Sequence, residues 1–347
     1  MEATASAFMQ KHHVPGMSVA IAKEGRLVYA RGFGLADKSC DEQVTPNHLF
    51  RIASLSKPIT ATTIFRLIER ERLRLSDKIF GMNDVLGTEY GKPPYRQYVE
   101  DISVEHLLTH TAGGWLNDGT DPMFRHAGMN HSQLIAWTLA NQPLKDPPGK
   151  HFAYSNFGYC ILGRVIEKVT GKSYADAVQA EVLGPCGISS MRIAGNKLAE
   201  RASREVVYYS QDSDGADPYG MDVRRMDAHG GWLAAAPDLV RFLVHVDNFP
   251  SKPDILKPGT IENMTTASPV STGYAKGWSV NKYHNWWHTG SLPGTVTIMV
   301  RTAQQFCWAA LTNTRTPDDL GGKLDHMIWE MVGKIRTWPQ HDLFSVG

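Results

Sequence analysis

A serine and a lysine three positions apart, Ser54 and Lys57, are the residues of this sequence whose types and spacing suggest chemistry most directly. An apolar run ends at Ala53 and a helical pattern follows, which predicts Ser54 at a helix N-terminus with Lys57 one turn later on the same face. A serine hydroxyl becomes a good nucleophile when a neighbouring amine removes its proton, and free N–H groups at a helix N-terminus favour the alkoxide that forms. The pair therefore indicates nucleophilic catalysis, although an N-capping serine followed by a solvated lysine has the same pattern.

Two other short patterns contain groups that could serve the same reaction. Tyr154 and Asn156 belong to a Tyr-Ser-Asn run before an apolar helical stretch, and a tyrosine hydroxyl near a lysine ammonium can act as a base. His288, Thr289 and Gly290 lie where a predicted strand reaches a turn, and an edge strand there could offer an N–H group to a developing oxyanion. Each pattern alone is explained as well by a packed tyrosine or a structural histidine.

The composition is that of an ordinary soluble globular protein, with 42% hydrophobic and 20% charged residues. A length of 347 residues suits two domains, or one core with a large insertion. The formal net charge of +1 argues against nucleic acid or an anionic membrane as a general partner. No apolar run is long enough to span a bilayer, and the N-terminal residues lack the pattern of a signal peptide, so we expect neither in this chain.

Neither a disulfide framework nor a metal site is expected. The four cysteines are scattered without framework spacing: Cys40, Cys160, Cys186 and Cys307. Two of them, Cys160 and Cys307, lie in apolar segments typical of buried thiols. His106 and His110 have a helical spacing that can bind zinc, but no third ligand accompanies them. We therefore predict no metal and no cofactor.

Periodicity predicts secondary structure at both ends of the chain. A helix over 1–13 precedes a β-hairpin of strands 16–23 and 26–34, and the Ser54 helix follows. Strands return late in the chain, at 277–280, 286–289, 295–300 and 306–312, and a helix over 318–336 follows them. Strands at both termini with helices between them indicate one sheet assembled from the two ends of the chain.

The middle of the chain has a different pattern. Helices are predicted at 102–110, 132–140, 157–169, 174–183 and 236–246, with an extra strand near 206–209. The prediction is an α/β (α+β) fold in which 1–77 and 268–347 form a domain with an antiparallel sheet flanked by helices. The segment 78–267 is a mostly helical inserted domain, and the active site lies in the cleft between the two. The loops Asp118–Asn130 and Gln211–Arg225 should shape its pockets.

The three patterns occur in the order and spacing of the serine β-lactamase and penicillin-binding protein superfamily. Within it the chain resembles the branch of class C β-lactamases, DD-peptidases and family VIII carboxylesterases, whose β-lactamase/transpeptidase-like fold agrees with the predicted one. Flanking segments agree over nearly the whole length, as in Leu107-Leu-Thr-His-Thr-Ala-Gly-Gly, Pro148-Gly-Lys and Gly230-Gly-Trp-Leu-Ala-Ala-Ala-Pro.

The resemblance implies a role for each residue of the first two patterns. Ser54 is expected to be the acylated nucleophile. Lys57 and Tyr154 are expected to share the general-base and general-acid work, with Tyr154 passing the proton to the leaving group. Asn156 is expected to position Lys57 and the substrate.

The third pattern is where the chain departs from many β-lactamases. The resemblance places His288 where those enzymes have a lysine, Thr289 facing the ligand, and the backbone N–H groups of Ser54 and Ser291 in the oxyanion hole. A lysine supplies a fixed positive charge for a substrate carboxylate, whereas histidine is mostly neutral at pH 7. His-x-Gly, here completed by Gly290, is familiar from members that resemble DD-carboxypeptidases and D-aminopeptidases.

The sequence thus predicts a serine hydrolase that works through an acyl-enzyme on small esters, amides or D-amino-acid peptides, with weak or no β-lactamase activity. An acyltransferase of the same fold and a penicillin-binding receptor without turnover stay open as alternatives. Partners are expected to be small molecules, β-lactams among the candidates, and neither nucleic acid nor a membrane span is expected. A periplasmic or secreted location agrees with the resemblance, while compartment and oligomeric state are left open.

Overall fold

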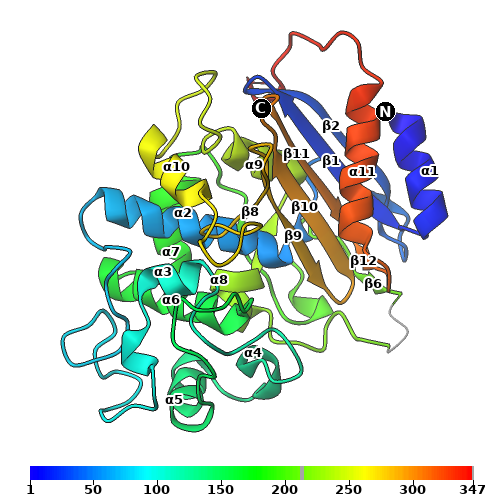
Figure 1. Ribbon diagram of the computed structural model, residues 1–347. Coiled ribbons are helices and arrows are strands. Elements are labelled where there is room, and N and C mark those ends of the chain that lie inside the picture. The colour runs from blue at the N-terminus through cyan, green and yellow to red at the C-terminus, as the bar shows by residue number, and fades with distance from the viewer. Residues whose placement is uncertain (212–214, 346–347) are drawn as a thin grey trace.

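A seven-stranded antiparallel sheet organises the protein, with the strand order β3-β2-β1-β11-β10-β9-β8. The computed structural model describes residues 1–211 and 215–345, so part of the predicted pocket loop Gln211–Arg225 lies outside the described residues. Figure 1 shows the sheet on one side of the molecule and most of the helices gathered on the other.

The central strands of the sheet come from both ends of the chain, as predicted. Antiparallel pairing joins the N-terminal strand to the last long strand, with Met17 opposite Thr312. The N-terminal strands are β1 (Gly16–Lys23), β2 (Arg26–Asp37) and β3 (Glu42–Gln43). The C-terminal strands are β8 (Ser279–Val280), β9 (Trp286–Leu292), β10 (Thr295–Arg301) and β11 (Phe306–Thr312). The predicted fold class is therefore confirmed.

Two helices cover the outer face of this sheet, α1 (Glu2–His12) and α11 (Leu320–Gly333). Figure 1 shows them side by side on the same side of the strands. Their apolar side chains, Phe8 and Ile328 among them, form one buried cluster with Trp308 of β11. Burial of this kind is what stabilises a helix of ordinary propensity on a sheet.

The inner face of the sheet carries α2 (Ser56–Glu69) and α9 (Ala236–Leu243). Helix α2 is buried along nearly its whole length, so it forms the centre of the main core. Helix α9 packs on β1 and β11, although its sequence falls in the segment 78–267 predicted as an inserted domain. The division of the chain into two domains at these boundaries stays a prediction.

Most of the remaining helices lie on one side of α2, away from the sheet, whereas α10 lies on the other side of α2 (Figure 1). The remaining helices are α3 (Val104–Leu108), α4 (Pro122–Arg125), α5 (His131–Asn141), α6 (Asn156–Thr170), α7 (Tyr174–Val178), α8 (Asp227–Gly230) and α10 (Pro258–Thr265). Helix α6 ends at Gly171, whose φ of 70° is the left-handed conformation that glycine adopts without strain. Helix α7 continues as a π-helical turn over Gln179–Leu183, where the sequence predicted one helix.

Two small sheets complete the secondary structure. Strand β7 (Trp232–Ala234) pairs with β4 (Phe50–Arg51) and β5 (Arg192–Ile193). Strand β6 (Tyr209–Ser210) pairs in parallel with β12 (Thr314–Arg315), so the extra strand predicted near 206–209 is short and begins at its last residue. In the described part of the chain no helix is both long and apolar enough to cross a membrane.

The four cysteines are free thiols, as expected. Cys160 and Cys307 are buried, as predicted from their apolar surroundings. Burial raises the pKa of Cys160 to about 12, so this thiol is protonated at neutral pH.

Gly290 lets strand β9 lie directly against the chain that leads into Ser54. A Cβ atom at Gly290 would lie 2.3 Å from the carbonyl oxygen of Ile52 and 2.4 Å from Oγ1 of Thr297. The same threonine hydroxyl donates a hydrogen bond of 2.8 Å to the Ile52 carbonyl. Only a residue without a side chain fits this contact between strand and turn.

Replacing Gly290 with alanine should therefore destabilise the fold, because either β9 or the turn at Ile52 must move. We expect the free energy of unfolding in urea to fall by about 1–3 kcal/mol. Gly333→Ala is the control, because a Cβ atom at that end of α11 meets nothing within 4 Å. Equal stability of Gly290→Ala and the wild type would contradict the close approach.

Candidate active site

Ser54 lies in a short 3₁₀ turn, Ala53–Leu55, and the α-helix that carries Lys57 begins two residues later at Ser56. The sequence had placed Ser54 at the N-terminus of the helix itself. The turn begins with Ala53 in the left-handed conformation, at a φ of 50°, which is unfavourable for alanine. It is held by the Ser56 hydroxyl, which donates a hydrogen bond of 2.7 Å to the Ala53 carbonyl.

Lys57 is completely buried, and its ammonium nitrogen has three hydrogen-bond partners. Nζ lies 3.0 Å from Ser54 Oγ, 2.8 Å from Asn156 Oδ1 and 2.9 Å from the carbonyl oxygen of His229. The structure thus brings together the two residues of the first pattern and Asn156 of the second.

The identity of these partners determines what Lys57 can do. The oxygens of Asn156 and His229 can only accept hydrogen bonds, so each takes one N–H of the amine. The remaining position on Nζ faces Ser54, and it holds a lone pair when the amine is neutral. Burial lowers the pKa of Lys57 well below its ordinary value, while the negative charge of Asp121 opposes the shift. The geometry therefore points the lone pair of a neutral lysine at the serine hydroxyl.

Tyr154 is placed to exchange a proton with the same serine. Its hydroxyl forms a hydrogen bond with the Ser54 side chain, and its ring centroid lies 4.7 Å from Lys57 Nζ. Burial raises the pKa of Tyr154 above its usual range, so the phenol is protonated at neutral pH. A protonated Tyr154 is suited to donate a proton. It is less suited to act as the phenolate base, which was one of the roles suggested by the sequence.

Asn156 is the first residue of α6, and its side chain is fixed at both ends. Ser155 caps this helix by accepting the N–H of Gly158 at 3.0 Å. The Asn156 amide nitrogen donates to Asn117 Oδ1 at 2.9 Å and to Asp121 Oδ2 at 3.0 Å. Its oxygen is thereby left to face Lys57.

A cavity of about 510 Å³ opens in front of these groups. Side chains of β9 alternate across the strand, so that His288 is buried while Thr289 and Ser291 are exposed. The cavity is lined by Ser54, Asn117, Phe152, Tyr154, Ser271, Gly273, Tyr274, Ser279, His288, Thr289 and Ser291. The structure therefore brings all three sequence patterns to one cavity.

His288 is neutral, and its hydrogen bonds fix the tautomer. Nδ1 lies 2.6 Å from the carbonyl oxygen of Thr289, which can only accept, so this nitrogen carries the proton. Nε2 then accepts the hydroxyl proton of Tyr274 at 3.1 Å. Burial and the neighbouring Lys57 lower the pKa of His288 to about 3. The third pattern therefore presents no fixed positive charge to a ligand.

His110 supports this arrangement from behind Tyr274. Its Nδ1 accepts the N–H of Ser155 at 3.1 Å, so its Nε2 carries the proton and donates to the Tyr274 hydroxyl at 3.2 Å. His106, four residues earlier, instead accepts the N–H of Ser103 at 3.2 Å in a helix cap. The two histidines thus serve different local structures and do not point at a common ion.

Several residues of the site were not singled out from the sequence. They are Asn117, Asp121, His229 and Tyr274; His110 was considered only as a possible zinc ligand and not as part of this site. Asp121 before Pro122 is a helix-start signal, and Asp121 does cap α4, but nothing in that signal indicates a contact with Asn156. His229 contributes only a backbone carbonyl, which no side-chain pattern can reveal.

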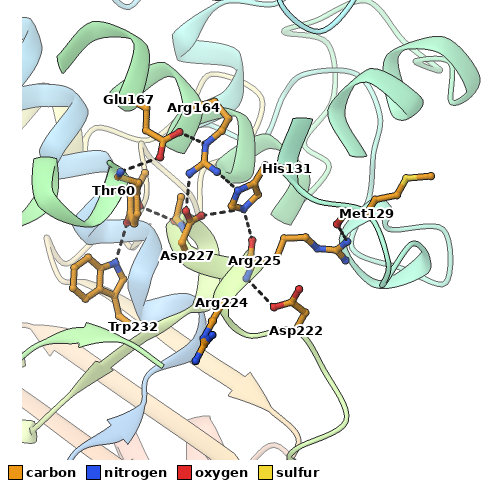
Figure 2. Close-up of polar contacts among 12 residues, drawn as sticks. Thr60, Met129, His131, Arg164, Glu167, Asp222, Arg224, Arg225, Asp227 and Trp232 are labelled. Carbon is orange, nitrogen blue, oxygen red and sulfur yellow. Dashed lines mark hydrogen bonds and ion pairs between the residues drawn. The ribbon is translucent and has the colours of Figure 1, made fainter. Parts of the chain in front are cut away.

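The His229 carbonyl is carried by α8, and Figure 2 shows the buried polar network behind this helix. Arg164 of α6 forms an ion pair of 2.6 Å with Asp227, the first residue of α8, and a second of 2.9 Å with Glu167. It also hydrogen-bonds His131, whose Nε2 donates to the carbonyl of Arg225 at 2.8 Å. The ion pair thus ties α8 to α6.

A second set of contacts holds α8 from the side of α2. The Thr60 hydroxyl, one turn beyond Lys57, donates to the carbonyl of Ala228 at 2.6 Å. A Cβ atom at Gly163 would lie 2.7 Å from the Cβ of Ala228, so α6 also packs closely on α8. The position of the His229 carbonyl therefore depends on contacts outside the cavity.

A model of the family described as Beta-lactamase matches residues 1–330 of the chain. The chain belongs to the β-lactamase family. Esterase EstB from Burkholderia gladioli is 29% identical over 248 residues, which cover 67% of this chain and 60% of the relative. Penicillin-binding protein 4* from Bacillus subtilis (strain 168) is 29% identical over 318 residues, or 84% of this chain and 66% of the relative. The resemblance inferred from the three patterns is confirmed, and the chain spans 60 to 66% of the length of these two members.

A solved structure of this fold aligns along almost the whole chain. D-amino acid amidase from Ochrobactrum anthropi SV3 superposes with a TM-score of 0.79 at 21% identity, covering 97% of this chain and 100% of that one. This likeness shows a shared fold.

Breaking the buried ion pair behind α8 should destabilise the protein far more than breaking an exposed one. Arg164→Met leaves Asp227 buried without its cation, and we expect the free energy of unfolding to fall by about 3–5 kcal/mol. Lys168→Met, on the same helix, removes an exposed ion pair with Glu89 and should cost less than about 1 kcal/mol. Urea unfolding of both variants measures the difference, and similar losses would argue against a supporting role for Arg164.

Proposed function

We propose that this protein is a serine hydrolase that acts through an acyl-enzyme on small, uncharged esters or amides. The observation that carries the proposal is the contact of 3.0 Å between Lys57 Nζ and Ser54 Oγ, with carbonyl oxygens on the other two partners of the amine. The names of an esterase relative and of an amidase with the same fold agree with this substrate class.

In the proposed acylation step, neutral Lys57 takes the proton of the Ser54 hydroxyl while Oγ forms a bond to the substrate carbonyl carbon. The carbonyl π electrons move onto oxygen, where the backbone N–H groups of Ser54 and Ser291 are proposed to stabilise the charge. The tetrahedral intermediate then collapses and the bond to the leaving group breaks. Tyr154 gives its proton to the leaving group and regains one from Lys57.

Deacylation repeats these steps with water. Water gives a proton to the basic group as its oxygen bonds to the acyl carbon, and the bond to Ser54 Oγ breaks. The proton returns to Ser54, so the products are a carboxylic acid and the alcohol or amine released earlier. Because the base is neutral Lys57, the rate should fall as the pH is lowered through the pKa of this residue.

The charge of the cavity supports uncharged substrates. His288 is neutral, and Lys57 is buried behind Ser54, so a substrate carboxylate would find no fixed cation from the third pattern. Phe152 lines the cavity and is 39% exposed, which offers apolar surface for an acyl chain. Thr289 and Gly290 are proposed to face the ligand along the edge of β9, and Asn156 to contact it beside Lys57.

Ser54→Ala should abolish hydrolysis of p-nitrophenyl butyrate, since no hydroxyl remains to be acylated. Lys57→Ala and Tyr154→Phe should each lower kcat/KM by on the order of 10³-fold. Initial rates with each purified variant measure these effects, and circular dichroism checks that the fold is kept. Near wild-type rates in Lys57→Ala or Tyr154→Phe would refute the proposed roles of these residues. If a labelled penicillin acylates Ser54 and is not turned over, the result would favour the receptor alternative.

His288→Lys should increase the reactivity of Ser54 towards carboxylate-bearing ligands, because it adds the cation that the third pattern lacks. We expect the second-order rate of acylation by benzylpenicillin to rise about tenfold or more relative to turnover of p-nitrophenyl butyrate. His288→Gln is the matched control, since it removes the imidazole without adding charge. An equal ratio in the two variants would show that charge at this position does not limit carboxylate ligands.

A further inference from the structure

Asp121 is a completely buried carboxylic acid at the back of the site. Its Oδ1 accepts the N–H of Met123 at 2.9 Å, and its Oδ2 accepts the Asn156 amide at 3.0 Å. Within residues 1–211 and 215–345 it forms no ion pair with a lysine, arginine or histidine. A buried charge without a direct partner costs several kcal/mol of folding free energy, so the presence of Asp121 needs an explanation.

The contact with Asn156 determines which way that amide points. Both hydrogens of its nitrogen are used, by Asn117 Oδ1 at 2.9 Å and by Asp121 Oδ2 at 3.0 Å. A carboxylate can only accept hydrogen bonds, so rotating the amide would set its oxygen against Asp121 and its NH₂ group against Lys57. The charge of Asp121 thus keeps the Asn156 oxygen on Lys57.

Asp121 is also the one negative group among those that face Lys57 in the described residues. The others are neutral rings or histidines: His110, Tyr154, Tyr159, His229 and His288. Burial lowers the pKa of Lys57 and Asp121 raises it, while burial raises the pKa of Asp121 itself to about 6. An amine whose pKa falls too far becomes a weak proton acceptor, so this anion keeps the base effective.

We propose that Asp121 is a positioning residue for the acylation of Ser54, acting through Asn156 on Lys57. It orients the amide that holds the lysine, and its negative charge maintains the basicity of the amine. The inference rests on the proposed function of Ser54 and Lys57. Asp121 touches neither the substrate nor the reacting atoms.

The charge can be removed with little change of shape in Asp121→Asn. The new NH₂ group would face the NH₂ group of Asn156, so one of the two amides must rotate and a hydrogen bond is lost. We expect kcat for p-nitrophenyl butyrate to fall by on the order of tenfold or more while KM changes little. Lys57 loses a neighbouring anion, so the acid limb of kcat/KM should move to lower pH by about one unit.

Asp118→Asn is the matched control, because Asp118 lies on the same loop and is exposed, with both of its hydrogen bonds to Thr120. It should leave kcat and the acid limb unchanged. Asn117→Ala separates the orientation of Asn156 from the charge near Lys57. It removes the other acceptor of the Asn156 amide but keeps the negative charge of Asp121. We expect it to lower kcat without moving the acid limb of kcat/KM.

Labelling of Ser54 by a fluorophosphonate, followed against pH, gives a second readout that needs no turnover. Ser54 Oγ bonds to phosphorus, fluoride leaves, and Lys57 takes the hydroxyl proton, so the labelling rate should show the same shift in Asp121→Asn. A wild type that is labelled but hydrolyses nothing would overturn the proposed hydrolase function. The role of Asp121 would then be tested by the pH dependence of the labelling rate alone. An acid limb in Asp121→Asn that stays in place or moves to higher pH would overturn the role of Asp121. If Asp121→Asn does not fold, Asn117→Ala still tests the proposal. A wild-type kcat in that variant would overturn the idea that the orientation of the Asn156 amide connects Asp121 to Lys57.

Discussion

The burial of one amine, Lys57, is the constraint on which the rest of the structure depends. Its three partners are separated from it by 3, 99 and 172 positions in the chain. A lysine in a dry interior is costly unless every hydrogen has an acceptor, so the segments that carry Ser54, Asn156 and His229 must meet accurately. The core around α2 provides this accuracy, because close-packed helices do not shift without opening cavities.

The surroundings of the amine also determine its charge. Two histidines, His110 and His288, hydrogen-bond the Tyr274 hydroxyl from opposite sides, and burial lowers the pKa of both. If His288 took a second proton, Tyr274 would face two donors and its own proton would lose its acceptor. A second proton on His110 would instead set its Nδ1 against the N–H of Ser155. Because His288 is neutral, the proposed proton transfers involve only Lys57, Tyr154 and Ser54, and the third pattern supplies no cation for a substrate carboxylate.

The parts of the fold that the sequence predicted are those governed by short-range rules. Ser54 and Lys57 face each other because they are three residues apart on helical backbone, and α6 ends at Gly171 because glycine tolerates the left-handed conformation. Long-range partners have no such signal. The sequence predicted a helix over 236–246, which contains α9, but not that α9 packs on β1 and β11. Likewise the four residues of α8 are too few to show a period, although this helix carries a partner of Lys57.

Both carbonyl partners of Lys57 are held from behind by buried carboxylates. Asp121 holds the Asn156 amide, and Asp227, through Arg164, holds the helix that carries the His229 carbonyl. The two carboxylates differ in what they do to the amine. Asp227 is paired with a cation, so its field at Lys57 is largely cancelled and its effect is geometric. Asp121 has no such cation among the described residues, so it acts on the charge of Lys57 as well as on its position. Both carboxylates therefore help to orient the amine, whereas its basicity depends on Asp121.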